Sequence, residues 1–215
     1  MSTSPKPKRA YNSTRRRAQA RQTRRLILEA AGKLFGERGY SGTSIEAIAQ
    51  GAGVAVETIY AAFGSKVAIL SKLVDFSVVG DDAPIPLLQR PGIQAARTEN
   101  DPRRLLEMFS GDVYAVMTRM SPIFSLLRTA AKSEPEIAAL LERLLAERLQ
   151  GMTFLVEQLA RVGGLRAGLD SQQAAETVWA LSSAEVFHLL TVERGWPSEK
   201  YRTWLVDSLA RILLD

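Results

Sequence analysis

The chain has 215 residues, of which 28 are Lys or Arg, 23 are Asp or Glu, one is His and none is Cys, giving a formal net charge of +5. This length suits one medium domain or a small domain joined to a larger one, and 46% apolar residues are enough to build a core. The lack of Cys excludes disulfides, thiolate metal sites and Cys nucleophiles. His188 is the single His, Ser182-Ser183 lacks a His-centred relay and no Gly-rich phosphate loop follows a strand, so we expect no metal, no cofactor and no enzymatic activity.

Signals for export or membrane insertion are not evident in the sequence. No uncharged apolar run reaches the ~18 residues of a membrane-spanning helix. The N-terminal residues also lack the apolar stretch of a secretory signal. We therefore expect a cytoplasmic protein with no membrane partner.

Charge is distributed unevenly along the chain. Residues 1–70 carry 12 basic and four acidic residues, the remainder carries 16 basic and 19 acidic residues, and no acidic residue precedes Glu29. Clustered Lys and Arg favour a polyanion partner such as DNA. Residues 1–22 have almost nothing apolar to bury, so we expect a disordered basic arm that contacts phosphates or the minor groove. A solubilising tail or a transit peptide would have a similar composition.

The first predicted helices follow this arm. Apolar residues between Gln22 and Arg38 recur at helical spacing, and Gly39 follows where a left-handed residue would end the helix. The stretch Thr43-Ser44-Ile45-Glu46 predicts a capping box, in which the Thr43 hydroxyl accepts from the Glu46 amide and a second helix starts at Ser44. Gly51 and Gly53 are expected to keep this helix short.

Two further helices complete the N-terminal region. One is predicted from Ala55 to Phe63 and is ended by Gly64. Ser65 is placed to cap the next, from Lys66 to about Val79. Two short helices joined by a Gly-containing turn behind a basic approach are the elements of a helix-turn-helix. The sequence therefore predicts a DNA-binding domain over residues 23–80.

The C-terminal region is predicted to be helical. Prolines and glycine interrupt residues 81–102, which we interpret as a linker holding a short helix near Ile93–Thr98. Beyond it, periodicity predicts a helix over about 105–120, a shorter one after Pro122, a long one from Pro135 to Gly163, and two more at about 171–193 and 198–214. The expected fold class is all-α with about nine helices, and residues 103–215 form a separate helical domain.

Residues in the N-terminal region also match a known pattern in type and spacing. They are Gly39-Tyr40, Thr43-Ser44, Ile48-Ala49, Gly53-Val54, Thr58-Ile59-Tyr60, Phe63 and Ser65-Lys66. Over about residues 24–70 the chain resembles the DNA-binding domain of the TetR (tetracycline-repressor-like) family of bacterial regulators. The resemblance implies an all-helical homodimer. Its third helix would enter the major groove, and its C-terminal domain would hold an effector pocket and the dimer interface.

Site residues follow from this placement. A helix in the major groove presents its N-terminal, outward side chains to base edges, here Ala55, Val56, Glu57 and Thr58. Phosphate contacts are expected from hydroxyls, cations and helix N-termini, namely Arg24, Arg25, Thr43, Ser44, Tyr60 and Lys66. The chain departs from the family pattern at Ala55, where a Ser or Thr cap is usual, and at Ala61-Ala62, where polar residues are common. Glu57 either accepts from cytosine N4 or turns towards basic neighbours or solvent.

The C-terminal domain supplies the remaining expectations. An effector pocket would be lined by apolar and aromatic side chains. Taken singly, each candidate fits ordinary core better than a pocket, and together they are Phe76, Phe109, Val113, Met117, Phe124, Leu127, Met152, Leu155, Trp179 and Phe187. The last two predicted helices carry apolar residues on more than one face, which favours a homodimer interface. The alternative is that both helices lie deep in a monomeric bundle.

The sequence thus predicts a homodimeric transcription regulator on a palindromic DNA operator, acting as a repressor that a small apolar or amphipathic ligand releases. One alternative is an architectural protein that binds DNA with weak specificity through its basic arm. Another is a ligand-binding module whose DNA function has degenerated. A regulator prefers its site about a thousandfold, an architectural protein shows a steep salt dependence with little preference, and a degenerate module shows neither.

Overall fold

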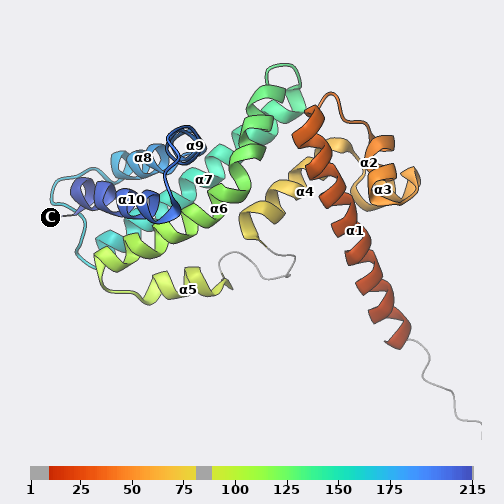
Figure 1. Cartoon of the computed structure of the whole chain (residues 1–215). Coiled ribbons are helices and arrows are strands. Elements are labelled where there is room, and N and C mark those ends of the chain that lie inside the picture. Colours follow the sequence, from red (N-terminus) through yellow and green to blue (C-terminus); the bar gives the residue numbers. More distant parts are fainter. Residues whose placement is uncertain (1–9, 81–88, 215) are drawn as a thin grey trace, which may run out of the picture. The chain divides into compact units, whose positions relative to one another are not determined.

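A computed structural model describes residues 10–80 and 89–214, with side chains from residue 15 onward (Figure 1). The chain divides into two compact units, Met1–Leu73 and Val74–Asp215. In the described ranges the elements are helices, and the one β-type pairing is an isolated bridge between Leu165 and Leu214, which confirms the all-α prediction. Within these same ranges no helix is both long and apolar enough to cross a membrane.

The first helix, α1, runs from Ala10 to Arg38 and therefore begins far earlier than expected. Its second half packs through the predicted stripe of Ile27, Ala31, Leu34 and Phe35. Residues 10–22, predicted to be disordered, continue the same helix, so that prediction was wrong for them. Ala, Arg and Gln are strong helix formers, and extending a helix that packing has already nucleated adds one hydrogen bond per residue. Residues 1–9 of the predicted arm lie outside the described residues.

The second helix, α2 (Ile45–Ala52), begins one residue after the predicted start at Ser44 and is short, as predicted. Gly51, expected to stop it, lies inside the helix. A Cβ atom at Gly51 would lie 3.3 Å from the Cβ atom of Ala30 in α1, closer than most real contacts. The glycine therefore permits a close approach of α1 and α2 rather than a turn.

The next two helices match their predicted ranges. α3 (Val56–Phe63) is followed by Gly64 at a φ of 82°, and α4 spans Lys66–Val79. The Ser65 hydroxyl accepts from the Ala68 amide at 3.2 Å and so caps α4 as expected. The division between the units falls after Leu73, inside α4, rather than at residue 80. Since α4 is one continuous helix, its first turns belong to the first unit and its last turn to the second.

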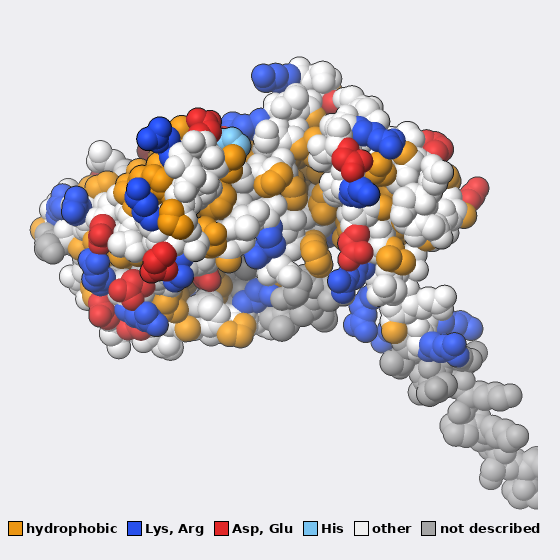
Figure 2. Space-filling view, in the orientation of Figure 1, with side chains coloured by type: hydrophobic (Ala, Val, Ile, Leu, Met, Phe, Trp, Pro, Cys, Tyr) orange, Lys and Arg blue, Asp and Glu red, His pale blue; other side chains and the backbone are white. Residues whose placement is uncertain are grey.

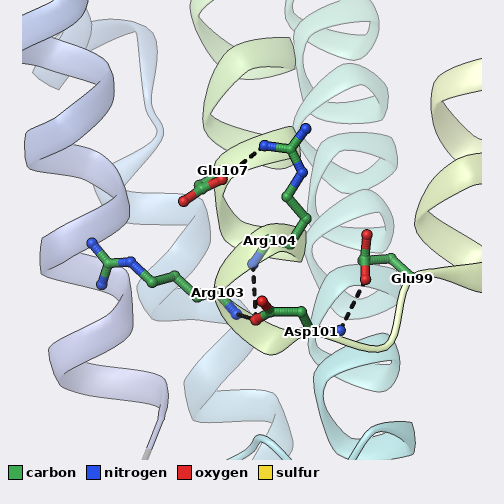
Figure 3. A network of polar contacts seen from close by, with 5 residues as sticks. All are labelled: Glu99, Asp101, Arg103, Arg104 and Glu107. Carbon is green, nitrogen blue, oxygen red and sulfur yellow. Dashed lines mark hydrogen bonds and ion pairs between the residues drawn. The ribbon is translucent and has the colours of Figure 1, made fainter.

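The second unit contains α5 (Pro91–Thr98), the short helix expected in the linker, and α6 (Pro102–Ala130). Figure 3 shows how α6 begins: the Asp101 carboxylate accepts from the amides of Arg103 at 2.9 Å and Arg104 at 3.3 Å. In the segment just before α6, the Glu99 carboxylate accepts from the Asp101 amide at 2.9 Å. The hydrogen bonds that the backbone amides of Asp101 and Asn100 donate to this carboxylate hold the pKa of Glu99 below its ordinary value.

Pro122 lies inside α6, so the two helices predicted around it are one. Proline removes one backbone hydrogen bond and crowds the preceding turn. The helix nevertheless keeps one buried face on both sides of it, formed by Val113, Met117, Met120, Phe124 and Leu127. Packing along this continuous face outweighs the local cost of the proline.

The rest of the unit comprises α7 (Pro135–Arg161), α8 (Ser171–Leu181), α9 (Ala184–His188), a π-helical turn (Leu189–Glu193) and α10 (Ser198–Leu213). The single helix predicted over 171–193 is therefore broken at Ser182-Ser183. The Ser183 hydroxyl caps α9 by accepting from the Val186 amide at 3.3 Å. At the end of α8, Arg148 from α7 donates to the Trp179 carbonyl and, at 2.9 Å, to the Ser182 hydroxyl.

Other arginines of this unit also bind backbone carbonyls far away in the chain. Arg119 of α6 donates to the Ser77 carbonyl at 2.7 Å, near the end of α4. Arg161 donates to the Glu99 carbonyl at 2.6 Å, and Arg166 donates to the Arg211 carbonyl in the last turn of α10. These carbonyls follow or end helices, where the helix itself supplies no partner. The arginines thus join separate helices of the second unit.

Candidate nucleic-acid interface

The turn between α2 and α3 gives the first unit its helix-turn-helix geometry. Gly53 adopts a φ of 65°, and its amide donates to carbonyls in the last turn of α2. The Val54 amide donates to the Ala49 carbonyl at 3.0 Å, which closes the turn. Ile48 of α2 and Ile59 of α3 are fully buried, so an apolar contact surface fixes the two helices in the unit.

The face of α3 that points away from Ile59 is exposed to solvent. Glu57 and Tyr60 are exposed, Tyr60 to 52%, whereas Val56 and Thr58 are half-buried. Ala55 stands at the N-cap and makes no side-chain hydrogen bond, as expected for an alanine there. The predicted base-reading residues therefore gather at the N-terminal, outward side of one short helix. Their contact with bases remains a prediction.

Thr43 does not have the role predicted for it. It is 1% exposed, and its hydroxyl donates into the domain, to the carbonyls of Leu34 at 3.1 Å and Gly39 at 2.8 Å. The hydroxyl is thus not available to a phosphate. The cap of α2 lies one residue later than the predicted box, because the exposed Ser44 hydroxyl accepts from the Ala47 amide at 3.1 Å.

The Glu46 side chain also takes part in this cap, but it accepts from its own amide and from the Ser44 hydroxyl. Hydrogen bonds from its own amide and from the Ser44 hydroxyl lower the pKa of Glu46. The carboxylate is therefore ionised at the N-terminus of α2, where it complements the helix dipole. The Ser44 side chain is exposed, but its hydroxyl already donates to Glu46, so a phosphate would have to replace that carboxylate as the acceptor.

Lys66 has an internal role that the sequence did not predict. Its ammonium donates to the carbonyls of Tyr40 at 2.9 Å and Thr43 at 3.0 Å, and it lies 4.1 Å from the centre of the Tyr40 ring. These bonds tie the start of α4 to the segment between α1 and α2. An ammonium has three N–H donors, so one is left for a phosphate. The only sequence signal for Tyr40 was its place in the family pattern.

The predicted arginine contacts lie on α1. Arg24 and Arg25 are exposed, and Arg25 forms an ion pair with Glu29 at 2.8 Å. An exposed pair of this kind contributes little to stability, so it leaves the guanidinium able to exchange partners. Figure 2 shows Lys and Arg side chains gathered along the described N-terminal part of α1. This basic surface belongs to the same unit as α3.

The predicted effector pocket residues lie inside the second unit. Val113, Met117, Phe124, Leu127, Leu155 and Phe187 are buried, and Phe76, Phe109, Met152 and Trp179 are half-buried. A hollow of about 480 Å³ lies elsewhere, between α6 and α10, and none of these residues lines it. Its walls are charged, with Arg103 paired to Asp207 at 2.8 Å and Arg104 paired to Glu107 at 2.9 Å. An apolar effector site at the predicted residues therefore remains a prediction.

Taken together, the residues of the first unit define the class of protein. Two short helices meet through a left-handed glycine, the second helix exposes its outer face, and α1 of the same unit carries exposed arginines. This is a helix-turn-helix arrangement suited to the major groove of DNA.

Comparisons with known proteins identify the family. The model of the bacterial regulatory proteins of the tetR family matches residues 27–73. The HTH-type transcriptional repressor BepR of Brucella suis biovar 1 (strain 1330) is 30% identical over 167 residues, which is 76% of each chain. The chain therefore belongs to the TetR family and is a DNA-binding transcriptional regulator, which confirms the family and the regulatory class predicted from the sequence.

Solved structures agree with this assignment. NalD, the secondary repressor of the MexAB-OprM multidrug efflux pump in Pseudomonas aeruginosa, is 26% identical with a TM-score of 0.66, over 91% of this chain and 98% of that one. The regulator FadR of Bacillus subtilis, in complex with stearoyl-CoA, has a TM-score of 0.69 at 18% identity, over 86% of this chain and 96% of that one. The second likeness concerns the fold alone.

Proposed function

We propose that this regulator is a homodimeric repressor that binds a two-fold symmetric operator with α3 in the major groove. The observation that carries the proposal is the exposed outer face of α3, with Glu57 and Tyr60 outward while Ile59 is fully buried. In this arrangement Ala55 and the half-buried Val56 offer methyl groups to thymine, and Glu57 accepts from cytosine N4. Ser44, Arg24 and the remaining donor of Lys66 hold phosphates and set the register.

Dimerisation is proposed through the last helices of the second unit. Leu189 and Val192 of the π-helical turn are 48% and 61% exposed, and Ile212 of α10 is 36% exposed. Large apolar side chains exposed on two neighbouring elements are typical of a surface that another chain covers. A two-fold contact would bury the same residues from both protomers and would pair two copies of α3 for two half-sites.

A small apolar or amphipathic ligand is proposed to release the operator. The named relatives support this, since NalD represses a multidrug efflux pump and FadR was solved with stearoyl-CoA. The ligand would bind among the predicted pocket residues of the second unit and favour a conformer with wrongly spaced recognition helices. A coupling of about 2–3 kcal/mol changes operator occupancy roughly 30- to 150-fold. We further propose a cytoplasmic location and no catalytic activity.

In-vitro selection of random duplex DNA by the purified chain at about 150 mM salt tests the proposal. We expect a consensus with two-fold symmetry, and a preference of about a thousandfold over unrelated duplex. Binding without a consensus that disappears as salt rises would replace the proposal with an architectural role. Absence of any DNA binding would favour a ligand-binding module instead.

A pair of variants shows whether α3 reads the site. Glu57→Gln is expected to change the preferred base at one position of each half-site, because an amide also donates and no longer selects cytosine N4. Glu37→Gln on α1 makes the same charge change at another exposed position of the unit and serves as the control. An identical consensus for the two variants would remove Glu57 from the reading surface.

A further inference from the structure

The described N-terminal part of α1 presents a line of arginines. Arg17, Arg21 and Arg24 recur at spacings of four and three residues, so they share one face of the helix. All three side chains are exposed. Figure 2 shows Lys and Arg side chains on this part of the helix.

Among the residues that the structure describes, none forms an ion pair or hydrogen bond with the side chains of these three arginines. Among the described side chains of α1, burial begins at Ile27, and none from residue 15 to residue 22 is buried. No acidic residue precedes Glu29, so no carboxylate on the same stretch neutralises Arg17 or Arg21. Like charges four residues apart destabilise a helix. An arrangement that is unfavourable in the free helix points to an external anion.

The composition of this stretch selects the anion. Between Arg15 and Arg25 the apolar side chains are Ala18 and Ala20, too little for an amphipathic helix that inserts into a membrane surface or docks in an apolar groove. A helix rises 1.5 Å per residue, so the line from Arg17 to Arg24 spans about 10 Å. Each DNA strand carries a phosphate about every 3.4 Å of duplex axis, so two or three phosphates lie within that span.

We propose that Arg17 and Arg21 bind phosphates of the duplex that flanks the operator half-site, and that they continue outward the contacts assigned to Arg24. The inference rests on the proposed operator binding and extends it to DNA beyond the bases that α3 reads. A helical extension fixes the arginines on one face, whereas a disordered arm would use all its basic residues alike. The experiment must therefore test whether arginines on this face of α1 contribute more to DNA binding than arginines on its other faces.

Two double variants of the full chain make the same charge change on different faces. Arg17→Gln with Arg21→Gln removes the proposed contacts, and Arg15→Gln with Arg16→Gln is the matched control on other faces of the same exposed stretch. Each is titrated with the selected operator alone and with the operator carrying about ten further base pairs on each side, between about 50 and about 300 mM salt. Thermal melting should be unchanged for both variants, because neither removes a buried group.

The Arg17 and Arg21 variant should lose about tenfold affinity for the flanked operator at low salt, and its slope of log affinity against log salt should flatten by about two per protomer. On the operator alone it should match the wild type within about threefold. The control variant should lose less than about threefold on either duplex.

Equal losses for the two variants, or equal losses on the two duplexes, would overturn the proposal. So would binding to phosphatidylglycerol vesicles that the Arg17 and Arg21 variant abolishes while flanked DNA is bound normally. Failure of the proposed function is a separate result, because it appears in the wild type as equal affinity for the operator and for a scrambled sequence.

Discussion

Arginines in the two units are used in opposite ways. In the first unit, Arg17, Arg21 and Arg24 are exposed along α1, ahead of the packed part of the helix. In the second, Arg119 and Arg148 reach across the unit and donate to carbonyls near the ends of α4 and α8. The same guanidinium is thus a free cation in one region and a helix-end ligand in the other. The difference teaches that an arginine without an internal acceptor is the one to assign to DNA.

The largest effect is expected from Arg148. Its guanidinium lies 5.0 Å from the centre of the Trp179 ring, and burial lowers its pKa to about 10, which still leaves it charged at neutral pH. Arg148→Met should destabilise the second unit by about 3 kcal/mol, because the Trp179 carbonyl loses its donor and the ring loses its cation. Thermal melting measures this loss, and the salt slope of operator binding should be unchanged. If Arg148→Met instead weakens DNA binding and leaves the melting temperature unchanged, Arg148 does not have the structural role assigned to it.

Lys66 is the exception that sharpens the comparison, since it is a basic residue of the first unit with internal acceptors. Lys66→Ala should cost about 2 kcal/mol of stability, because two charge-assisted hydrogen bonds to the carbonyls of Tyr40 and Thr43 are lost. Operator affinity should fall evenly across sequences. Lys33→Ala, at an exposed position on α1, is the control. If Lys66→Ala weakens binding without lowering the melting temperature, the internal role is secondary.

Tyr201 gives the smallest effect, in the opposite direction. It is fully buried against Phe187, with ring centres 5.2 Å apart, and its hydroxyl has no hydrogen-bond partner among the described residues. Tyr201→Phe should therefore raise stability by about 1 kcal/mol, since it removes an unsatisfied buried hydroxyl. Denaturant titration measures this gain at neutral pH. A stability loss would show that the hydroxyl has a partner, such as a bound water or ligand.

The same variant should respond to pH. Burial raises the pKa of Tyr201 to about 12, from an ordinary value of 10.0. Between these values the folded chain keeps a proton that the unfolded chain has lost, so wild-type stability falls as pH rises from 10 to 12. The advantage of Tyr201→Phe should therefore grow over that range.

Local sequence rules predicted most of the first unit. The glycine turns at Gly39, Gly53 and Gly64, and the cap at Ser65, depend on neighbouring residues alone, and the structure has them where expected. Thr43 was misassigned because two adjacent hydroxyl residues precede α2 and only packing decides which of them turns inward. Sequence reasoning also missed that packing at Ile27 nucleates a helix that extends back to Ala10.

The second unit was harder to predict because its helix ends depend on distant residues. The break between α8 and α9 lies where Arg148, 31 residues from Trp179 in sequence, takes up the free carbonyl. One signal was present: the apolar stripe of α7 skips from Leu144 to Met152, and Arg148 stands midway on the same face. A cation in an apolar stripe indicates that a partner lies across it. The base-reading and pocket residues cannot be ranked from sequence alone, since both groups lie where ordinary surface and core residues lie.

The start of α3 has no side-chain cap. Ala55 brings a methyl group to the position where other helices of the unit have a hydroxyl, so the first amides of α3 have no side-chain acceptor. The missing acceptor makes the start of this helix less stable by about 1 kcal/mol. Among α2, α3 and α4, α3 is thus the helix whose first turn frays most readily in the free protein. If α3 binds the operator as proposed, phosphate oxygens of the DNA would accept from these amides, and binding would order the first turn of α3.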